Sequence, residues 1–183
     1  MEPSPSCRSF GRSIAIDDTN DRLHNRAATA ILGTFMKLIF TKGAGKYDHM
    51  DVVRDGAPAE RVDCPKQRII PHDMVHYAVE HTLQTRGFLG RVKEGEAAVF
   101  QMQSEATSDG VERLVEVIQG DAWSGGQSSA RDLVELYEVT CSARQCPTLP
   151  VGEAEVDAIR AEIARLDSAW QALPVGGRLE LVL

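Results

Sequence analysis

The hydrophobic pattern changes along the chain, from alternating apolar positions to apolar stripes at helical spacing. The segments KLIFT (37–41), YDHMDVVR (47–54) and AERVDC (59–64) alternate or run apolar. The stretches KGAGK and DGAP between them have the composition of turns, so the three segments predict a β-meander. Pro65 is expected to end the third strand, because proline has no backbone N–H to donate to a ladder.

After Pro65 the apolar residues recur every three or four positions, which indicates amphipathic helices. The first predicted helix starts at Pro71, whose fixed φ suits a helix start, and runs to about Arg86. Gly87 is expected to end it in the left-handed conformation. Three further helices are predicted, over residues 109–118, 130–140 and 153–170. Asp109 with Glu112 and Ser129 with Asp132 have the spacing of N-terminal caps.

The last predicted helix has the clearest apolar stripe, which repeats at intervals of three and four residues. Its members are Val156, Ile159, Ile163, Leu166 and Trp170. This stripe is too short for a stand-alone coiled coil, so it is expected to pack within its own domain. The final RLELVL (178–183) alternates leucines with other residues and predicts a strand that pairs with the meander. The fold class is therefore α+β, an N-terminal antiparallel meander plus a C-terminal strand, covered by about four helices.

The start of the chain differs from the rest. MEPSPSCRSFGRS is rich in serine, arginine and proline and has little apolar periodicity. We expect residues 1–35 to be a disordered or loosely attached extension, and residues 36–183 to form a single α+β domain whose strand signal begins at Met36.

Three segments together are similar to a known group of proteins. FTKGAGKYD, IIPHDMVHYAVE and LPVGGRLELV resemble a family of small, uncharacterised bacterial proteins, over roughly residues 36–183. The resemblance supports a folded part that starts at Met36, and it implies no activity.

Composition and charge narrow the classes of partner. Of 183 residues, 43% are hydrophobic and 26% charged, which is typical of globular proteins. A net charge of −7 opposes phosphate backbones and anionic membrane surfaces, so neither nucleic acid nor membrane is an expected partner. The apolar run AATAILGTFM is shorter than the roughly 20 residues that span a bilayer. Four cysteines without a framework spacing favour a reduced, cytoplasmic protein.

The segment PHDMVHYAVEH (71–81) carries the densest candidate chemistry. His72, His76 and Glu80 recur every four residues beside the apolar face of the predicted helix. Histidines four apart can direct ring nitrogens at one zinc-like divalent cation, as in H-E-x-x-H sites. Because three ligands on one helix would spread over about 12 Å, His49 from a neighbouring strand is a candidate further ligand. Asp73 takes the place of the catalytic glutamate and is the candidate catalytic residue.

A purely structural interpretation of the same segment needs no cofactor. His72 and Asp73 would then serve the helix N-terminus, His76 and Glu80 would form a surface pair, and His81 would be solvated.

Other motifs give weaker signals. KGAGK lacks the glycine and the serine or threonine of a phosphate-binding P-loop. Cys141 and Cys146 have neither redox C-x-x-C nor zinc spacing and are predicted to be buried or idle thiols. Trp123 is expected to be exposed, and Trp170 to be buried.

The sequence therefore favours a ligand-binding or protein-interaction module without catalysis, whose partner is a small molecule or a protein. The alternative is a metal-dependent, hydrolase-like enzyme centred on the predicted histidine helix. An enzyme predicts a concave pocket at the two histidines that contains a second carboxylate or histidine within ligand reach, whereas a module predicts side chains that are solvated or paired within the helix.

Overall fold

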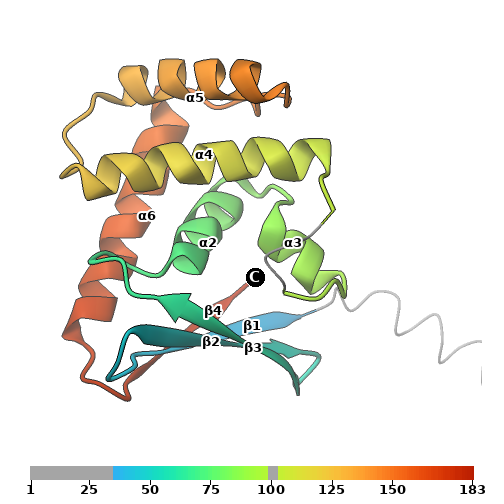
Figure 1. Ribbon diagram of the computed structural model, residues 1–183, viewed down its shortest axis with the longest axis vertical. Helices are drawn as coiled ribbons and strands as arrows, with labels where there is room; N and C mark the ends of the chain where they lie inside the picture. Colours follow the sequence, from blue (N-terminus) through green and yellow to red (C-terminus); the bar gives the residue numbers. More distant parts are fainter. Residues whose placement is uncertain (1–34, 99–102) are drawn as a thin grey trace, which may run out of the picture. The chain divides into compact units, whose positions relative to one another are not determined.

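Four antiparallel strands form one sheet in the part of the chain that the structure describes. The structure is a computed structural model, and it describes residues 35–98 and 103–183 (Figure 1). The strands are β1 (Met36–Thr41), β2 (Tyr47–Arg54), β3 (Ala57–Pro65) and β4 (Arg178–Val182), in the order β3-β2-β1-β4. The predicted meander and its pairing with the C-terminal strand are thus confirmed. The predicted N-terminal extension lies outside the described residues, apart from Phe35.

The hairpin between β2 and β3 shows how local sequence sets the register. Arg54 pairs with Ala57, so only Asp55 and Gly56 form the turn. Both have positive φ, 49° and 79°, as a two-residue type I′ turn requires, and Asp-Gly is a preferred sequence for it. The turn predicted at DGAP is therefore present.

The helices lie on one side of the sheet (Figure 1). They are α2 (His72–Leu83), α3 (Phe88–Lys93), α4 (Ala106–Trp123), α5 (Ala130–Arg144) and α6 (Glu153–Ala172). Helices α2 and α3 are next to the sheet, α4 covers them, and α5 lies outermost, while α6 runs beside them from α5 to the sheet. Within the described ranges, none of these helices combines the length and apolar character needed to cross a bilayer.

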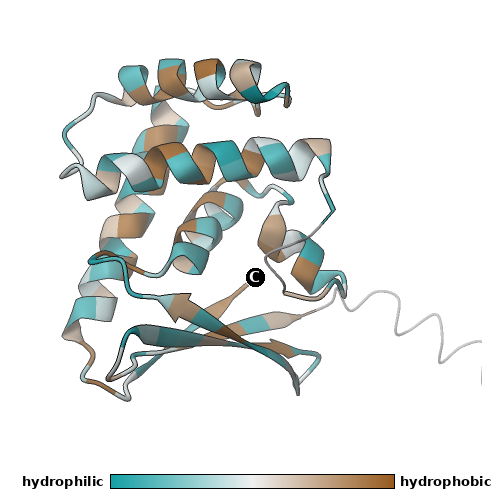
Figure 2. Ribbon diagram, in the orientation of Figure 1, coloured by the Kyte–Doolittle hydropathy of each residue, from teal (hydrophilic) through white to brown (hydrophobic). Residues whose placement is uncertain are grey.

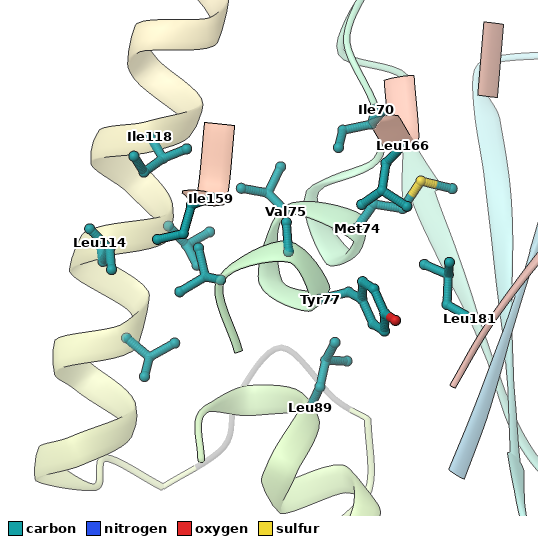
Figure 3. Packing of buried hydrophobic residues seen from close by; sticks show 14 of the residues in the cluster. Ile70, Met74, Val75, Tyr77, Leu89, Leu114, Ile118, Ile159, Leu166 and Leu181 are labelled. Atoms are coloured by element: carbon teal, nitrogen blue, oxygen red, sulfur yellow. The ribbon is translucent and has the colours of Figure 1, made fainter. Parts of the chain in front are cut away.

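Helix α2 is the central element of the core. It contacts α3, α4 and α6, and every residue from Met74 to Glu80 is buried. Figure 3 shows Met74, Val75 and Tyr77 surrounded by side chains from α4, α6 and β4. The outer helices instead mix apolar and polar residues along their length (Figure 2). Two polar residues of α2, His76 and Glu80, are therefore buried between packed elements.

The apolar stripe of α6 packs inward as predicted. Four of its members are buried, namely Val156, Ile159, Leu166 and Trp170. The fifth, Ile163, is partly buried and packs against the core. In β4, Leu181 is buried and Arg178 is exposed. The predicted alternation of that strand is thus confirmed.

The boundaries of α2 correct the predicted ones. The helix ends at Leu83, and Gln84 adopts the left-handed conformation with φ of 48°. Gly87 has φ of −120° and lies at the N-terminus of α3 instead. The expected left-handed stop at Gly87 is therefore wrong, and α3 is a helix beyond those predicted from the sequence.

The two predicted caps have different outcomes. The Ser129 side chain accepts a hydrogen bond from the backbone N–H of Asp132 at 3.1 Å, as predicted. Helix α4, by contrast, begins at Ala106 after Glu105. Asp109 and Glu112 therefore lie inside the helix, and their predicted role as a cap is wrong.

Candidate metal centre

His76 lies on α2 where it faces α4, and its imidazole is enclosed between two carboxylates. Its Nε2 atom is 3.1 Å from Glu112 Oε2 on α4, and its Nδ1 atom is 3.4 Å from Glu80 Oε1. The side chain is only 3% exposed. Among the described residues Nδ1 lacks a partner with hydrogen-bond geometry. Nε2 is thus paired closely with Glu112, whereas Nδ1 has the Glu80 carboxylate nearby without hydrogen-bond geometry.

The two acids decide the charge of His76. Burial disfavours the imidazolium and alone would lower its pKa. Hydrogen bonding and charge from Glu112 and Glu80 outweigh that effect and raise the pKa of His76 to about 9. The pKa of Glu112 is lowered, because its interaction with His76 outweighs its own burial. At neutral pH without a cation, His76 is therefore positively charged.

Glu80 is fixed by the N-terminus of α3. Its carboxylate accepts backbone N–H groups from Gly87 at 2.9 Å, Leu89 at 2.9 Å and Gly90 at 2.8 Å. These amides have no carbonyl partner within a helix that starts there, so the acid satisfies them. A Cβ at Gly87 would come within 2.8 Å of Glu80 Cδ. Glycine therefore allows the close approach that this contact requires.

His72 stands one turn before His76 and has a separate support. Its Nδ1 atom is 2.9 Å from Gln119 Oε1 on α4, and the amide nitrogen of Gln119 donates to Gln67. Because the amide oxygen of Gln119 faces the ring, Nδ1 is the atom that carries the proton in neutral His72. The lone pair on Nε2 is then free on the other edge, 3.9 Å from Glu112 Oε1.

His72, His76 and Glu112 form a compact group of potential metal ligands. Their ligand atoms lie within 4.8 Å of one another, and the two rings pack edge to face with centroids 4.8 Å apart. Two imidazole nitrogens and a carboxylate oxygen are ligands for first-row divalent metals. The side chains of His72 and Glu112 are 31% and 34% exposed, so water can reach this side of the group.

The predicted ligands divide into two groups. The structure brings His72 and His76 together, whereas Glu80 lies on the far edge of the His76 ring. His49 pairs with Asp63 at 2.9 Å, and it lies between two buried residues of β2, Asp48 and Met50. Since strand side chains alternate between faces, His49 points away from the helices. The expected approach of His49 to the helix is therefore not found.

Asp73 and the structural interpretation also need correction. Asp73 Oδ2 accepts a weak hydrogen bond from Cys64 Sγ at 3.3 Å and faces the end of β3 rather than the histidines. His76 and Glu80 were expected to form a surface pair, yet their side chains are 3% and 0% exposed. His81 is exposed, as that interpretation predicted.

Glu112 is the member of the group that the sequence interpretation missed. It was assigned to a cap because it follows Asp109 by three residues. On α4, however, Glu112 and Gln119 are seven residues apart and both face α2. Two polar residues at that spacing, beside the buried Val111, Leu114 and Ile118, were a usable signal.

The lysine- and glycine-rich turn after β1 has a structural role. Lys42 Nζ donates to the backbone oxygens of Trp170 at 3.0 Å and Leu173 at 3.1 Å, at the C-terminus of α6. A cation there complements the helix dipole. Of the two lysines of KGAGK, Lys42 therefore stabilises the C-terminus of α6.

Comparison with known proteins adds no relative. Neither protein-family models, nor curated proteins, nor solved structures give a match to this chain. The functional argument therefore rests on the geometry of the site.

Proposed function

We propose that the protein binds a divalent transition metal through His72, His76 and Glu112. One observation carries the proposal: both Nε2 atoms face Glu112, while Nδ1 of His72 is held by the amide oxygen of Gln119. Nδ1 of His76 has the Glu80 carboxylate 3.4 Å away, without hydrogen-bond geometry. Metal-bound histidines usually have such an oxygen partner on the second nitrogen, because it fixes the ring and strengthens the ligand. Two histidines that only pair with an acid at a protein surface would not need a hydrogen-bond partner that fixes the second ring nitrogen.

The ligand types favour zinc or another borderline divalent ion. Two imidazoles with one carboxylate leave at least one coordination position for water or a bound molecule. His72 and Glu112, on the partly exposed side, would border that position. Histidine must lose its proton to bind, so affinity is expected to rise with pH.

A metal-dependent binding module fits this arrangement better than a hydrolase. Hydrolysis at such a metal needs a base that can accept a proton from bound water. Asp73 contacts Cys64, away from the group, and Glu80 is tied to three backbone amides. Hydrolysis is the second candidate function, favoured by the solvent access of His72 and Glu112.

Calorimetric titration of untagged, metal-stripped protein with zinc tests the proposal. The unmodified chain is expected to bind one equivalent. His72→Gln and Glu112→Gln each remove a ligand at a partly exposed position and are expected to lower the affinity at least about 100-fold. Gln119→Met keeps all three ligands but removes the support of His72, together with the hydrogen bond to Gln67, and should lower the affinity by about 10- to 100-fold.

His49→Gln and His81→Gln are the matched controls, because both remove a histidine outside the group. They should bind zinc as the unmodified chain does, and circular dichroism should show all five variants folded. If zinc is not bound, or if His72→Gln and Glu112→Gln bind it unchanged, the proposal fails.

A further inference from the structure

Two cysteines approach each other where α5 ends. Gln145 has a left-handed φ of 55°, which turns the chain back so that the backbone N–H of Cys146 donates to the carbonyl oxygen of Cys141 at 3.1 Å. Cys146 Sγ is 3.8 Å from that same oxygen. This hydrogen bond and the contact between the two thiols place the cysteines side by side, and a disulfide joins residues whose α-carbons are roughly 4.4–6.8 Å apart.

The two thiols differ in access. Cys141 is fully buried, whereas Cys146 is partly exposed. Cys146 lines a surface cavity of about 220 Å³ together with Asp109, Arg113 and Arg144. Burial and a hydrogen bond with the Cys146 thiol raise the pKa of Cys141. A reagent in solution therefore meets Cys146 first, with Cys141 directly behind it.

We propose that Cys141 and Cys146 are a dithiol site that forms a reversible disulfide with a small, anionic disulfide as oxidant. The Cys146 thiolate attacks one sulfur of the oxidant, whose S–S bond breaks and releases one thiol. Cys141 then loses its proton and attacks the Cys146 sulfur of the mixed disulfide, which releases the second thiol. The protein loses two electrons and two protons, and the oxidant becomes two thiols.

The cavity beside Cys146 suits a carboxylate-bearing oxidant such as glutathione disulfide. The charged residues that line the cavity are two arginines and one aspartate. One of them, Arg113, is also paired with Glu116 at 2.6 Å. Guanidinium groups bind carboxylates through paired hydrogen bonds.

Cys64 provides an internal contrast. It is buried, and burial together with the charge of Asp73 strongly raises the pKa of its thiol. Its Sγ also donates to the Asp73 carboxylate instead of facing a second thiol, so Cys64 lacks the arrangement that Cys141 and Cys146 share.

Oxidation would fix the segment that follows α5. The Tyr137 hydroxyl already accepts the N–H of Leu149 at 2.8 Å and donates to the carbonyl of Gly110 at 3.2 Å. A disulfide would add a second, covalent tie between α5 and this segment. The oxidised protein is therefore expected to melt a few degrees higher than the reduced one. This inference is independent of the metal proposal.

Peptide mapping of the full chain after incubation in glutathione redox buffers tests the inference. Free thiols are alkylated in denaturant, and the unfolded protein is then digested with trypsin without reduction. Trypsin cuts after Arg144, between the two cysteines. Oxidised protein should yield peptides 132–144 and 145–160 joined by a disulfide, and dithiothreitol should separate them.

Variants assign the order of attack. Cys146→Ser should give no joined peptides, whereas Cys141→Ser should accumulate a glutathione adduct on Cys146. Cys64→Ser is the matched control and should oxidise as the unmodified chain does. The proposal is overturned if both cysteines are alkylated separately at every buffer ratio, if Cys146 pairs with another cysteine, or if the glutathione adduct persists in the unmodified chain.

Discussion

Glu80 and Glu112 approach the same imidazole from opposite edges, yet their surroundings differ. Glu80 has a fully buried side chain and accepts three backbone N–H groups of α3. Glu112 is 34% exposed and contacts the rings of His72 and His76. The first acid completes a helix end as well as a charge pair. The second contacts two imidazole rings, and a cation bound as proposed would take the place of the imidazolium charge beside it.

Within one cluster, Glu80 stabilises the fold, whereas Glu112 belongs to the proposed metal-binding group. Replacement of Glu80 affects α3 and the core together, because the three amides then lose their acceptor. Replacement of Glu112 affects only the charge balance of two rings. Stability measurements can therefore distinguish the two acids even where both alter His76.

The largest expected effect is that of Glu80→Gln. Glutamine has nearly the same side-chain shape as glutamate, but its amide nitrogen would face backbone N–H groups that need an acceptor. His76 would also lose one of its two neighbouring carboxylates. Breaking a buried charge pair on one side costs about 3–5 kcal/mol. Glu112→Gln is expected to cost about 1.5–3 kcal/mol, the value of a hydrogen bond to a charged group, because it uncovers no backbone N–H group. Urea unfolding at pH 7 measures both, and equal losses would contradict the assigned difference.

A slightly smaller effect is expected from pH. The pKa of His76 is raised from 6.5 to about 9 in the folded chain. Its stabilisation is therefore complete below about pH 6.5 and is lost as pH rises through 9, by roughly 3 kcal/mol in all. Urea unfolding between pH 6 and 9.5, with a chelator present, should show this loss.

The Glu112→Gln variant sharpens the pH experiment. Removal of the larger of the two acidic contributions should bring the pKa of His76 back toward 6.5, so less stability is lost over the same pH range. A variant that loses as much stability as the unmodified chain would show that Glu112 does not hold the charge of His76.

The smallest expected effect concerns the glycines that admit Glu80. Gly87→Ala would place a Cβ 2.6 Å from Val111 Cγ1 and 2.8 Å from Glu80 Cδ. We expect a loss of about 1–3 kcal/mol from this overpacking. Gly120→Ala on α4 is the control, because a Cβ there meets no atom of the described residues within 4 Å. It should stabilise the chain by up to about 1 kcal/mol, and a loss as large as that of Gly87→Ala would contradict the explanation.

Local patterns predicted much of the fold but only His72 and His76 of the three side chains in the candidate metal centre. The Asp-Gly turn, the Ser129 cap and the stripe of α6 depend on neighbours within a few residues, so they were visible in the sequence. The six residues of α3 carry too short a pattern for detection. His72 and His76 share one helix and were found together, whereas Glu112 reaches them through the packing of α4 on α2. The spacing of four residues predicts Glu80 as a ligand as well, but its carboxylate accepts three backbone N–H groups of α3, a helix that the sequence pattern does not reveal.

The position of β4 has a consequence for how the chain is made. Its residues pair with β1, so that Lys37 faces Val182 across nearly the whole length of the described domain. The last strand of the sheet is thus the last to leave the ribosome. Until then the edge of β1 that pairs with β4 has no strand beside it, and the core beneath α2 lacks the buried side chain of Leu181. The sheet is therefore expected to reach its final form only after synthesis of residues 178–182, because the pairing of β1 with β4 joins segments far apart in the sequence.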